Sequence, residues 1–332
     1  MTEPRLDILG IGNAIVDVIA PCDDDFLAAH ALNKGGMRLI DEAAAETLYA
    51  AMGQTLVVSG GSAANTIIGA AALGARAGFI GKVKQDPIGQ MFGHDIRAAK
   101  VAFDTSPAAD GVASARCLIL VTPDGQRTMN TFLGACQALS EADVDPAQVA
   151  AARITYLEGY LWDPPAAKTA FLKAAEIAHK AGRKVALSLS DAFCVDRYRD
   201  EFLHLIRSRA IDILFANESE LHSLYQTADF KTAVAQLRED DVLAAVTRGD
   251  KGALVVTREE TQAINAFPIE HLVDTTGAGD LFAAGFLVGL SQEQTLADCA
   301  RLGALAAAEV IQHYGARPQA DLRALATENG LL

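Results

Sequence analysis

The sequence predicts an α/β protein with a doubly wound, mainly parallel sheet. Short apolar runs alternate with longer segments of helical period over most of the 332 residues. This is the order of successive βα units. Polar, glycine-rich turns follow several of the apolar runs, as they do at the carboxyl ends of parallel strands. In addition, 51% of the residues are apolar, so the chain can bury a large core.

Strands are expected where short apolar runs stand between turn residues. These runs are Ile8–Ile11, Leu56–Val58, Ala77–Ile80, Arg116–Val121, Ile154–Glu158, Lys184–Leu189, Ile213–Ala216, Val242–Val246 and Gly252–Thr257. Helices are expected where the apolar spacing changes to a helical period. They are Ala64–Leu73, Ile88–Ala99, Pro165–Ala181, Asp196–Ser208, Ser219–Tyr225, Phe230–Glu239, Gly279–Leu290 and Leu296–Ile311. Because the two kinds of segment alternate, crossover connections make neighbouring strands parallel.

Two segments fit this rhythm poorly. Val16–Ile40 and Ala113–Leu133 lack a helical period, and the second contains the turn sequence T-P-D-G at Thr122–Gly125. Both are better explained as antiparallel strands. We therefore expect a single domain over residues 1–332, with a small antiparallel lid formed by about residues 13–41 and 112–134 inserted into the α/β core. A lid would exclude water from transfer chemistry.

Composition excludes several classes of partner. The formal net charge of −14, with no run of Lys and Arg, argues against nucleic acid and anionic membranes. The longest apolar stretch, Thr66–Ile80, is too broken to span a bilayer. The five cysteines include no C-x-x-C pair, and the N-terminal segment lacks a signal-peptide pattern. We therefore expect a cytoplasmic monomer or homodimer that acts on a small molecule.

The strongest chemical signal lies near the C-terminus. The segment reads V-D-T-T-G-A-G-D-L-F-A-A-G-F over residues 273–286. If Phe267–Val273 leads into the motif and Gly279–Leu290 is a helix, Gly277, Ala278 and Gly279 lie at the helix N-terminus. Free N–H groups and the helix dipole at such a terminus attract an anion, and phosphate is the most obvious one.

Asp280 is the unexpected member of this segment, because a carboxylate would repel a phosphate unless it had a separate task. Taking a proton from an attacking hydroxyl is such a task. The alternative is that Asp280 only complements the helix dipole from the first turn.

Four other stretches could join this segment in one cleft. They follow predicted strands, and their sequences are G-N-A-I-V-D (Gly12–Asp17), G-G-S-A-A-N (Gly60–Asn65), N-E-S-E (Asn217–Glu220) and T-R-G-D-K-G (Thr247–Gly252). Ligands of open α/β sheets bind at the carboxyl ends of the strands. Neither a G-x-x-x-x-G-K-[ST] phosphate loop nor a complete dinucleotide fingerprint occurs.

Together these stretches resemble the ribokinase/PfkB family of small-molecule kinases. G-G-S-A-A-N-T-I-I-G-A-A-A-L-G resembles the family's N-terminal signature, and D-T-T-G-A-G-D-L-F resembles its C-terminal one. The similarity runs over nearly the whole chain in the family's order, and the second motif is highly specific. The resemblance implies a ribokinase-like fold and transfer of the γ-phosphoryl group of ATP to a hydroxymethyl group.

The resemblance also assigns catalytic roles. It implies that Asp280 is the general base and that the backbone of Gly277–Asp280 is the anion hole. N-E-S-E matches the family's N-x-x-E element, which makes Asn217 and Glu220 candidates for organising Mg²⁺ and phosphate, largely through water. The alternative for this pair is a helix N-cap followed by an acidic residue in the first turn.

Two further groups of residues match family positions. Thr247, Gly249 and Gly252 match the ATP-binding strand and turn. Asp274 and Thr276 match positions near a monovalent-cation site, which suggests that K⁺ could be required in addition to Mg²⁺.

Five residues are implied to bind the substrate. Asp17 and Asn65 match positions that hold sugar hydroxyls, and Asn13 belongs to the same stretch as Asp17. A carboxylate that accepts two neighbouring O–H groups can recognise a cis-diol. Gly60 and Gly61 would let a sugar ring approach the backbone. The alternatives are that Asp17 closes a strand and that Asn65 belongs to a helix N-terminus.

Within the family, G-I-G-N-A-I-V-D-V, M-N-T-F-L-G-A and E-V-I-Q-H-Y-G-A-R-P are most similar to adenosine kinases, so adenosine is the expected substrate. Glu158 stands where sugar kinases use an acid, which would suit ribose, fructose or a related sugar. Inosine and guanosine are further alternatives.

Arg127 either reaches the phosphates or lies on the lid hairpin. Phe132, Tyr160 and Trp162 stack on a purine or belong to the core. A different class of protein is a nucleoside- or sugar-binding sensor without catalytic activity, but such a protein would have no use for Asp280 as a base.

Overall fold

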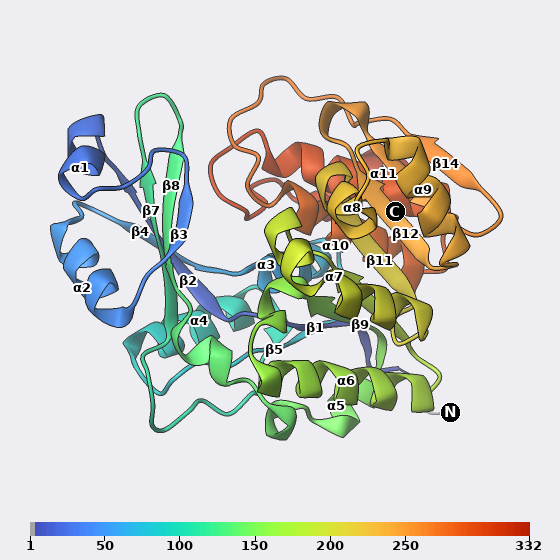
Figure 1. The fold of residues 1–332 in the computed structure, drawn as a ribbon, viewed down its shortest axis with the longest axis horizontal. Coiled ribbons are helices and arrows are strands. Elements are labelled where there is room, and N and C mark those ends of the chain that lie inside the picture. Colours follow the sequence, from blue (N-terminus) through green and yellow to red (C-terminus); the bar gives the residue numbers. More distant parts are fainter. Residues whose placement is uncertain (1–3) are drawn as a thin grey trace.

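A computed structural model describes residues 4–332 and contains two sheets of unequal size (Figure 1). The large sheet and its helices form the body of the molecule, and the small sheet stands at one side of it. Helices α1 (Asp24–Ala29) and α2 (Glu42–Ala51) pack beside the small sheet. Residues 1–3 of the predicted domain lie outside the described part of the chain.

The large sheet has the strand order β14-β13-β12-β11-β10-β9-β1-β5-β6. Pairings from β12 to β6 are parallel, and β13 and β14 join as antiparallel strands. This order confirms the expected α/β fold. The strands are β1 Leu6–Ile11, β5 Ala77–Ile80, β6 Val101–Ala102, β9 Ala152–Glu158, β10 Lys184–Ser188, β11 Ile213–Asn217, β12 Leu243–Thr247, β13 Ala253–Val256 and β14 Thr261–Ile264.

Helices cover both faces of the large sheet, because successive strand residues point to opposite faces and both sets are apolar. Ile8 of β1 belongs to the core beside α3, α10 and α11, whereas Leu9 belongs to the core beside α6 to α9. Helix α10 is buried along Leu281–Gly289, where it contacts α3 and α11. The remaining helices are α3 Ser62–Ala72, α4 Pro87–Ala98, α5 Pro146–Ala150, α6 Pro165–Lys180, α7 Ala192–Arg207, α8 Glu218–Tyr225, α9 Phe230–Glu239, α10 Ala278–Ser291, α11 Leu296–Val310 and α12 Leu322–Glu328.

The small sheet has the strand order β3-β8-β7-β2-β4. Its pairings are antiparallel for β2/β4 and β7/β8 and parallel for β2/β7 and β3/β8, so the small sheet contains the expected antiparallel pairs but is mixed as a whole. The chain leaves the large sheet twice, and the two outgoing strands β2 and β7 run in the same direction. The strands are β2 Ile15–Pro21, β3 Met37–Leu39, β4 Leu56–Gly60, β7 Ala115–Val121 and β8 Arg127–Phe132. Strand β4 lies outside both segments predicted for the lid.

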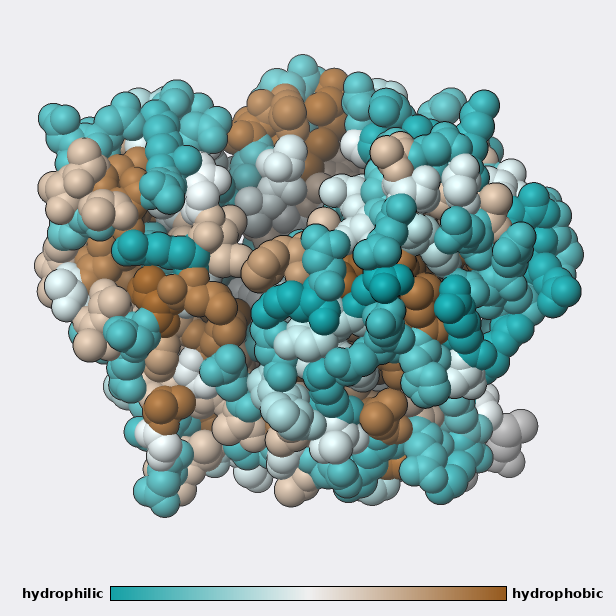
Figure 2. All heavy atoms as spheres, viewed as in Figure 1, coloured by the Kyte–Doolittle hydropathy of each residue, from teal (hydrophilic) through white to brown (hydrophobic). Residues whose placement is uncertain are grey.

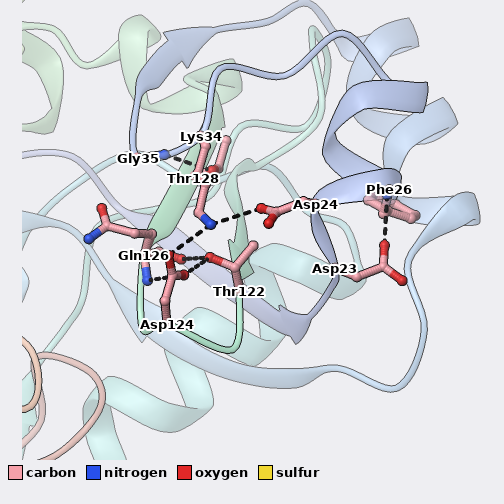
Figure 3. A network of polar contacts seen from close by, with 9 residues as sticks. All are labelled: Asp23, Asp24, Phe26, Lys34, Gly35, Thr122, Asp124, Gln126 and Thr128. Carbon is pink, nitrogen blue, oxygen red and sulfur yellow. Dashed lines mark hydrogen bonds and ion pairs between the residues drawn. The ribbon is translucent and has the colours of Figure 1, made fainter.

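A polar network fixes the β7–β8 turn to the segment between α1 and β3 (Figure 3). Lys34 forms ion pairs of 2.8 Å with both Asp24 and Asp124. Asp124 also accepts a hydrogen bond from the Thr122 hydroxyl at 2.6 Å, which closes the T-P-D-G turn. These contacts make the end of the small sheet one connected unit. Its role as a lid stays a prediction.

Every predicted strand and helix overlaps an observed one, but Phe267–Val273, the expected lead-in to the C-terminal motif, is irregular. Strand β14 already forms the edge of the large sheet, and Pro268 cannot donate to a strand ladder. The motif therefore follows a loop and not a strand. Within residues 4–332, no helix combines the length and apolar character needed to cross a membrane.

Candidate active site

The polar turns predicted to share a cleft meet at the carboxyl ends of the parallel strands. Asn13 follows β1, and Glu158 ends the neighbouring strand β9. Asn217 and Thr247 are direct partners at the ends of β11 and β12. The surface is hollowed between this edge and the small sheet (Figure 2). The one exception to the expected placement is the turn Gly60–Asn65, which follows a strand of the small sheet.

Asp280 lies in the first turn of α10, where two side chains of α3 hold it. Its Oδ1 accepts a hydrogen bond from the Ser62 hydroxyl at 2.7 Å, and its Oδ2 accepts one from Nδ2 of Asn65 at 3.0 Å. Desolvation raises the pKa of Asp280 to about 6, although both hydrogen bonds and the charge of Arg317 oppose the shift. A half-buried carboxylate with this pKa is ionised at pH 7 and can still accept a proton.

The turn before α10 has the geometry of an anion site. Gly277 is the N-cap residue with φ +81°, and a Cβ there would lie 2.6 Å from Cβ of Ala316. Only glycine fits both requirements. The Ala278 N–H donates to the Thr275 carbonyl at 3.2 Å, so it is removed from the predicted anion hole. The N–H groups of Gly277, Gly279 and Asp280 have no hydrogen-bond partner among the described residues.

Glu158 is almost fully buried and holds two other segments of the site together. Its carboxylate accepts hydrogen bonds from Asn13 Nδ2 at 2.6 Å and from the N–H of Ala63 at 2.8 Å. Desolvation raises the pKa of Glu158 to about 7, against the effect of these bonds. The structure thus uses both carboxylate oxygens inside the protein, and Glu158 fixes Asn13 against the start of α3.

Asp17 lies on β2, and its carboxylate interacts electrostatically with that of Asp280 in α10. Desolvation raises the pKa of Asp17 to about 6, while the charges of Arg317 and Arg127 act in the opposite direction. A Cβ at Gly60 would lie 2.3 Å from Oδ2 of Asp17, so this glycine makes room for the carboxylate itself. Gly61 is the N-cap residue of α3.

An apolar row crosses the small sheet beside Asp17. Strand register places Leu56, Ile19, Ile119, Met129 and Met37 side by side on five strands. Ile19 lies two residues from Asp17 and therefore points to the same face of the sheet. The ends of the row, Leu56 and Met37, are exposed. A polar carboxylate thus stands next to an apolar, partly open surface.

Asn217 and Glu220 form a capping box at the start of α8. Asn217 Oδ1 accepts from the Glu220 N–H at 2.9 Å, and Glu220 Oε2 accepts from the Asn217 N–H at 3.0 Å. Desolvation raises the pKa of Glu220 to about 7. Glu220 is buried and engaged, so it does not fit as a direct Mg²⁺ ligand. Within residues 4–332, no three His, Cys, Asp or Glu side chains form a group able to hold a metal.

The predicted ATP-binding residues lie in one turn beside this cap. Thr247 ends β12, and Gly249 and Gly252 lie in the connection to β13. Arg248, between them, forms a 3.2 Å ion pair with Glu218 of α8. The turn and the cap are therefore held next to each other at the edge of the sheet.

The predicted monovalent-cation residues bind a guanidinium group. Arg127 of β8 donates to both Asp274 and Thr276. Asp274 also accepts from the N–H groups of Thr276 and Gly315, both at 3.0 Å. In this conformation a positive side chain from the small sheet and two N–H groups already occupy the carboxylate, so its surroundings do not fit K⁺.

Two functional candidates were missed by sequence reasoning. Ser62 belongs to G-G-S-A-A-N but was not singled out, and Arg317 belongs to the quoted stretch ending G-A-R-P.

The aromatic residues proposed to stack on a purine differ in placement. Phe132 and Trp162 are buried in the core, whereas Tyr160 is 37% exposed at the site edge.

Comparisons with known proteins point to one family. The model of the pfkB family carbohydrate kinases matches residues 37–322. A ribokinase from Haemophilus influenzae is 30% identical and covers 80% of this chain and 85% of its own. A structure of a probable sugar kinase protein from Rhizobium etli is 51% identical, with TM-score 0.93 and coverage of 99% and 100%. A structure of adenosine kinase from Sinorhizobium meliloti is also 51% identical, with TM-score 0.92 and coverage of 98% and 99%.

Proposed function

Because the chain belongs to the pfkB family of carbohydrate kinases, we propose that it transfers the γ-phosphoryl group of ATP to the 5′-hydroxyl of adenosine to give AMP. Membership of the family implies ATP as phosphoryl donor and typically Mg²⁺, which neutralises phosphate charge when bound.

Asp280 is proposed to take the proton of the attacking hydroxyl. The hydrogen bonds from Ser62 and Asn65 fix the direction of its carboxylate. The oxygen of the 5′-hydroxyl then attacks the γ-phosphorus, the bond to the bridging oxygen of ADP breaks, and the proton passes to Asp280. The free N–H groups at Gly277, Gly279 and Asp280 would stabilise negative charge on the transferred group.

Asp17 is proposed to hold the two ribose hydroxyls. It is a half-buried carboxylate with no hydrogen-bond partner among the described residues, and it lies close enough to Asp280 for the two charges to interact. A carboxylate can accept both O–H groups of a cis-diol at once. This contact would orient the sugar so that its 5′-hydroxyl points toward the base.

The apolar row beside Asp17 is the observation that favours a nucleoside over a free sugar. A flat nucleobase attached to the ribose would cover the partly buried side chains Ile19 and Met129, and burying their remaining surface would stabilise the complex. A free sugar is smaller and carries hydroxyls in every direction, so it would cover less of this apolar surface. The alternative, a kinase for ribose, fructose or a related sugar, is favoured by the similarity to sugar kinases.

The test is ATP consumption with four acceptors offered separately: adenosine, inosine, ribose and fructose. We expect the highest kcat/KM with adenosine and measurable AMP as product. A higher kcat/KM with ribose or fructose would show that the chain is a sugar kinase. ATP-independent binding of adenosine without turnover would favour the silent sensor.

A further inference from the structure

Arg317 anchors the small sheet to the body of the molecule. It lies in the loop after α11, and its Nε donates to the carbonyl of Ser59, in β4, at 3.1 Å. Its Nη2 donates to the Ser59 hydroxyl at 2.7 Å. Ser59 is buried, and its own N–H donates to Asp95 of α4 at 2.8 Å. Arg317 therefore fixes the strand that ends in Gly60, against which the Asp17 carboxylate lies.

The same loop also holds the turn before α10. The Gly315 N–H donates to Asp274 Oδ2 at 3.0 Å, and Ala316 packs against Gly277 so closely that no side chain fits there. Three consecutive residues, 315 to 317, thus contact the candidate anion site on one side and β4 on the other. The loop sets the spacing between the two carboxylates of the site.

Arg317 also carries a charge that both carboxylates experience. Asp17 and Asp280 interact electrostatically with its guanidinium group, as does Asp95. Burial lowers the pKa of Arg317 to about 10, so it stays protonated at pH 7. Its Nη1 is buried without a hydrogen-bond partner in residues 4–332. The other groups that face the two carboxylates are Arg127, Cys117, Glu158, Tyr156 and Tyr160.

We propose that Arg317 is a positioning residue for the transfer: it ties β4 to the turn before α10 and supplies the positive charge that keeps Asp17 and Asp280 ionised together. This inference rests on the proposed kinase function. Two carboxylates that both need to be negative repel each other, and the transferred phosphoryl group brings more negative charge. A fixed cation that interacts with both carboxylates reduces that repulsion.

Replacing the guanidinium with a neutral group should therefore change the pH profile and not only the rate. One nearby opposite charge shifts a carboxyl pKa by about one unit or more. If the pKa of Asp280 rises from about 6 to about 7, its ionised fraction at pH 6 falls about fivefold and at pH 8 hardly changes. A residue that only supports the fold would lower activity equally at both pH values.

The experiment measures kcat/KM from pH 5 to pH 8.5 for wild type, Arg317→Gln, Arg317→Lys and the control Arg301→Gln. Arg301 is an exposed residue of α11 whose side chain is 59% accessible and pairs with Asp298. The acid limb is the part of the profile in which kcat/KM falls as pH decreases. We expect the midpoint of this limb to rise by about one pH unit in Arg317→Gln and to be unchanged in Arg317→Lys and Arg301→Gln. An unmoved limb in Arg317→Gln overturns the proposal. If that variant does not fold, a shifted limb in Arg317→Lys, which keeps the charge, overturns it instead.

Failure of the kinase function would be visible separately, as a wild type that phosphorylates none of the four acceptors. In that case Tm of wild type and Arg317→Gln is compared at pH 5 and pH 8. The charge role predicts that the difference in Tm widens with pH, because the two carboxylates become ionised in this range. A constant difference would contradict it.

Discussion

Asp280→Asn tests the central step of the proposed reaction. The carboxylate of Asp280 accepts one hydrogen bond from a hydroxyl and one from an amide. The new amide can keep both contacts, because its oxygen accepts from Asn65 and its NH₂ group donates to the hydroxyl of Ser62, which can act as an acceptor. The fold should therefore be retained, with a stability change of about 1 kcal/mol or less.

The catalytic effect should be much larger. Loss of a general base typically lowers the rate by about 10²-fold or more, which corresponds to about 2.7 kcal/mol in the barrier. In the wild type the pKa of about 6 predicts that kcat/KM falls as pH drops through 6, because protonated Asp280 cannot accept the proton. The variant has no titrating group at this position, so this limb should disappear from its residual activity.

The assay is a coupled measurement of ADP release from pH 5 to pH 8, together with ATP binding and Tm for both proteins. Unchanged ATP binding and Tm would locate the loss in the chemical step. Turnover close to that of the wild type, or a wild-type profile that is flat through pH 6, would refute the role of Asp280 as base.

Three further predictions concern the substrate side of the site and its buried acids. Asp17→Ala should raise KM for adenosine at least ~10-fold. The wild type should use 2′-deoxyadenosine less well than adenosine, whereas Asp17→Ala should use the two nucleosides about equally. Equal kcat/KM of both nucleosides with the wild type would disprove the diol contact. Gly60→Ala should also raise KM, because the added Cβ would lie 2.3 Å from Oδ2 of Asp17, and an unchanged KM would show that the carboxylate can move freely. Glu158 and Glu220 each have a folded pKa of about 7, above the usual 4.5, so the stability they contribute is present below pH 4.5 and is lost as pH rises through 7. Tm of the ligand-free protein should therefore fall between pH 5 and pH 8, and Glu158→Gln should flatten part of this decline; the same slope in the variant would exclude Glu158 as a source.

The sequence was sufficient for the elements that depend on local pattern. Apolar runs marked the strands of the large sheet that position the site, including β9 with Glu158 and β11 with Asn217. Residue type alone was less informative about Glu158. An acid at this position resembles a hydroxyl ligand, but its partners Asn13 and Ala63 lie 145 and 95 residues away along the chain. The parallel pairing of β1 with β9 brings Asn13 to Glu158, and the packing of α3 against the same sheet brings Ala63 there.

The small sheet shows the same limit. Its antiparallel hairpin at β7 and β8 follows from a local turn, whereas the parallel pairing of β2 with β7 joins segments that are far apart in sequence. Strand β4 lies outside the segments predicted for the lid, because nothing in L-V-V-S-G distinguishes a strand of the small sheet from one of the large sheet. Arg317 was missed for a related reason, because an arginine in a loop reveals its partner Ser59 only after the chain has folded.

The burial of α10 has a consequence for the order in which the protein can fold during synthesis. This helix contacts α3 and β1, which are made at the beginning of translation, but its own residues 278–291 emerge from the ribosome near the end. The chain is made from its N-terminus, and a domain generally folds as a unit. A nascent chain that already carries β1 and α3 therefore exposes the apolar surface that α10 covers until residues 278–291 have been made. During that interval the unfinished chain offers a binding surface for chaperones, and a stop codon before residue 278 would leave that surface permanently open.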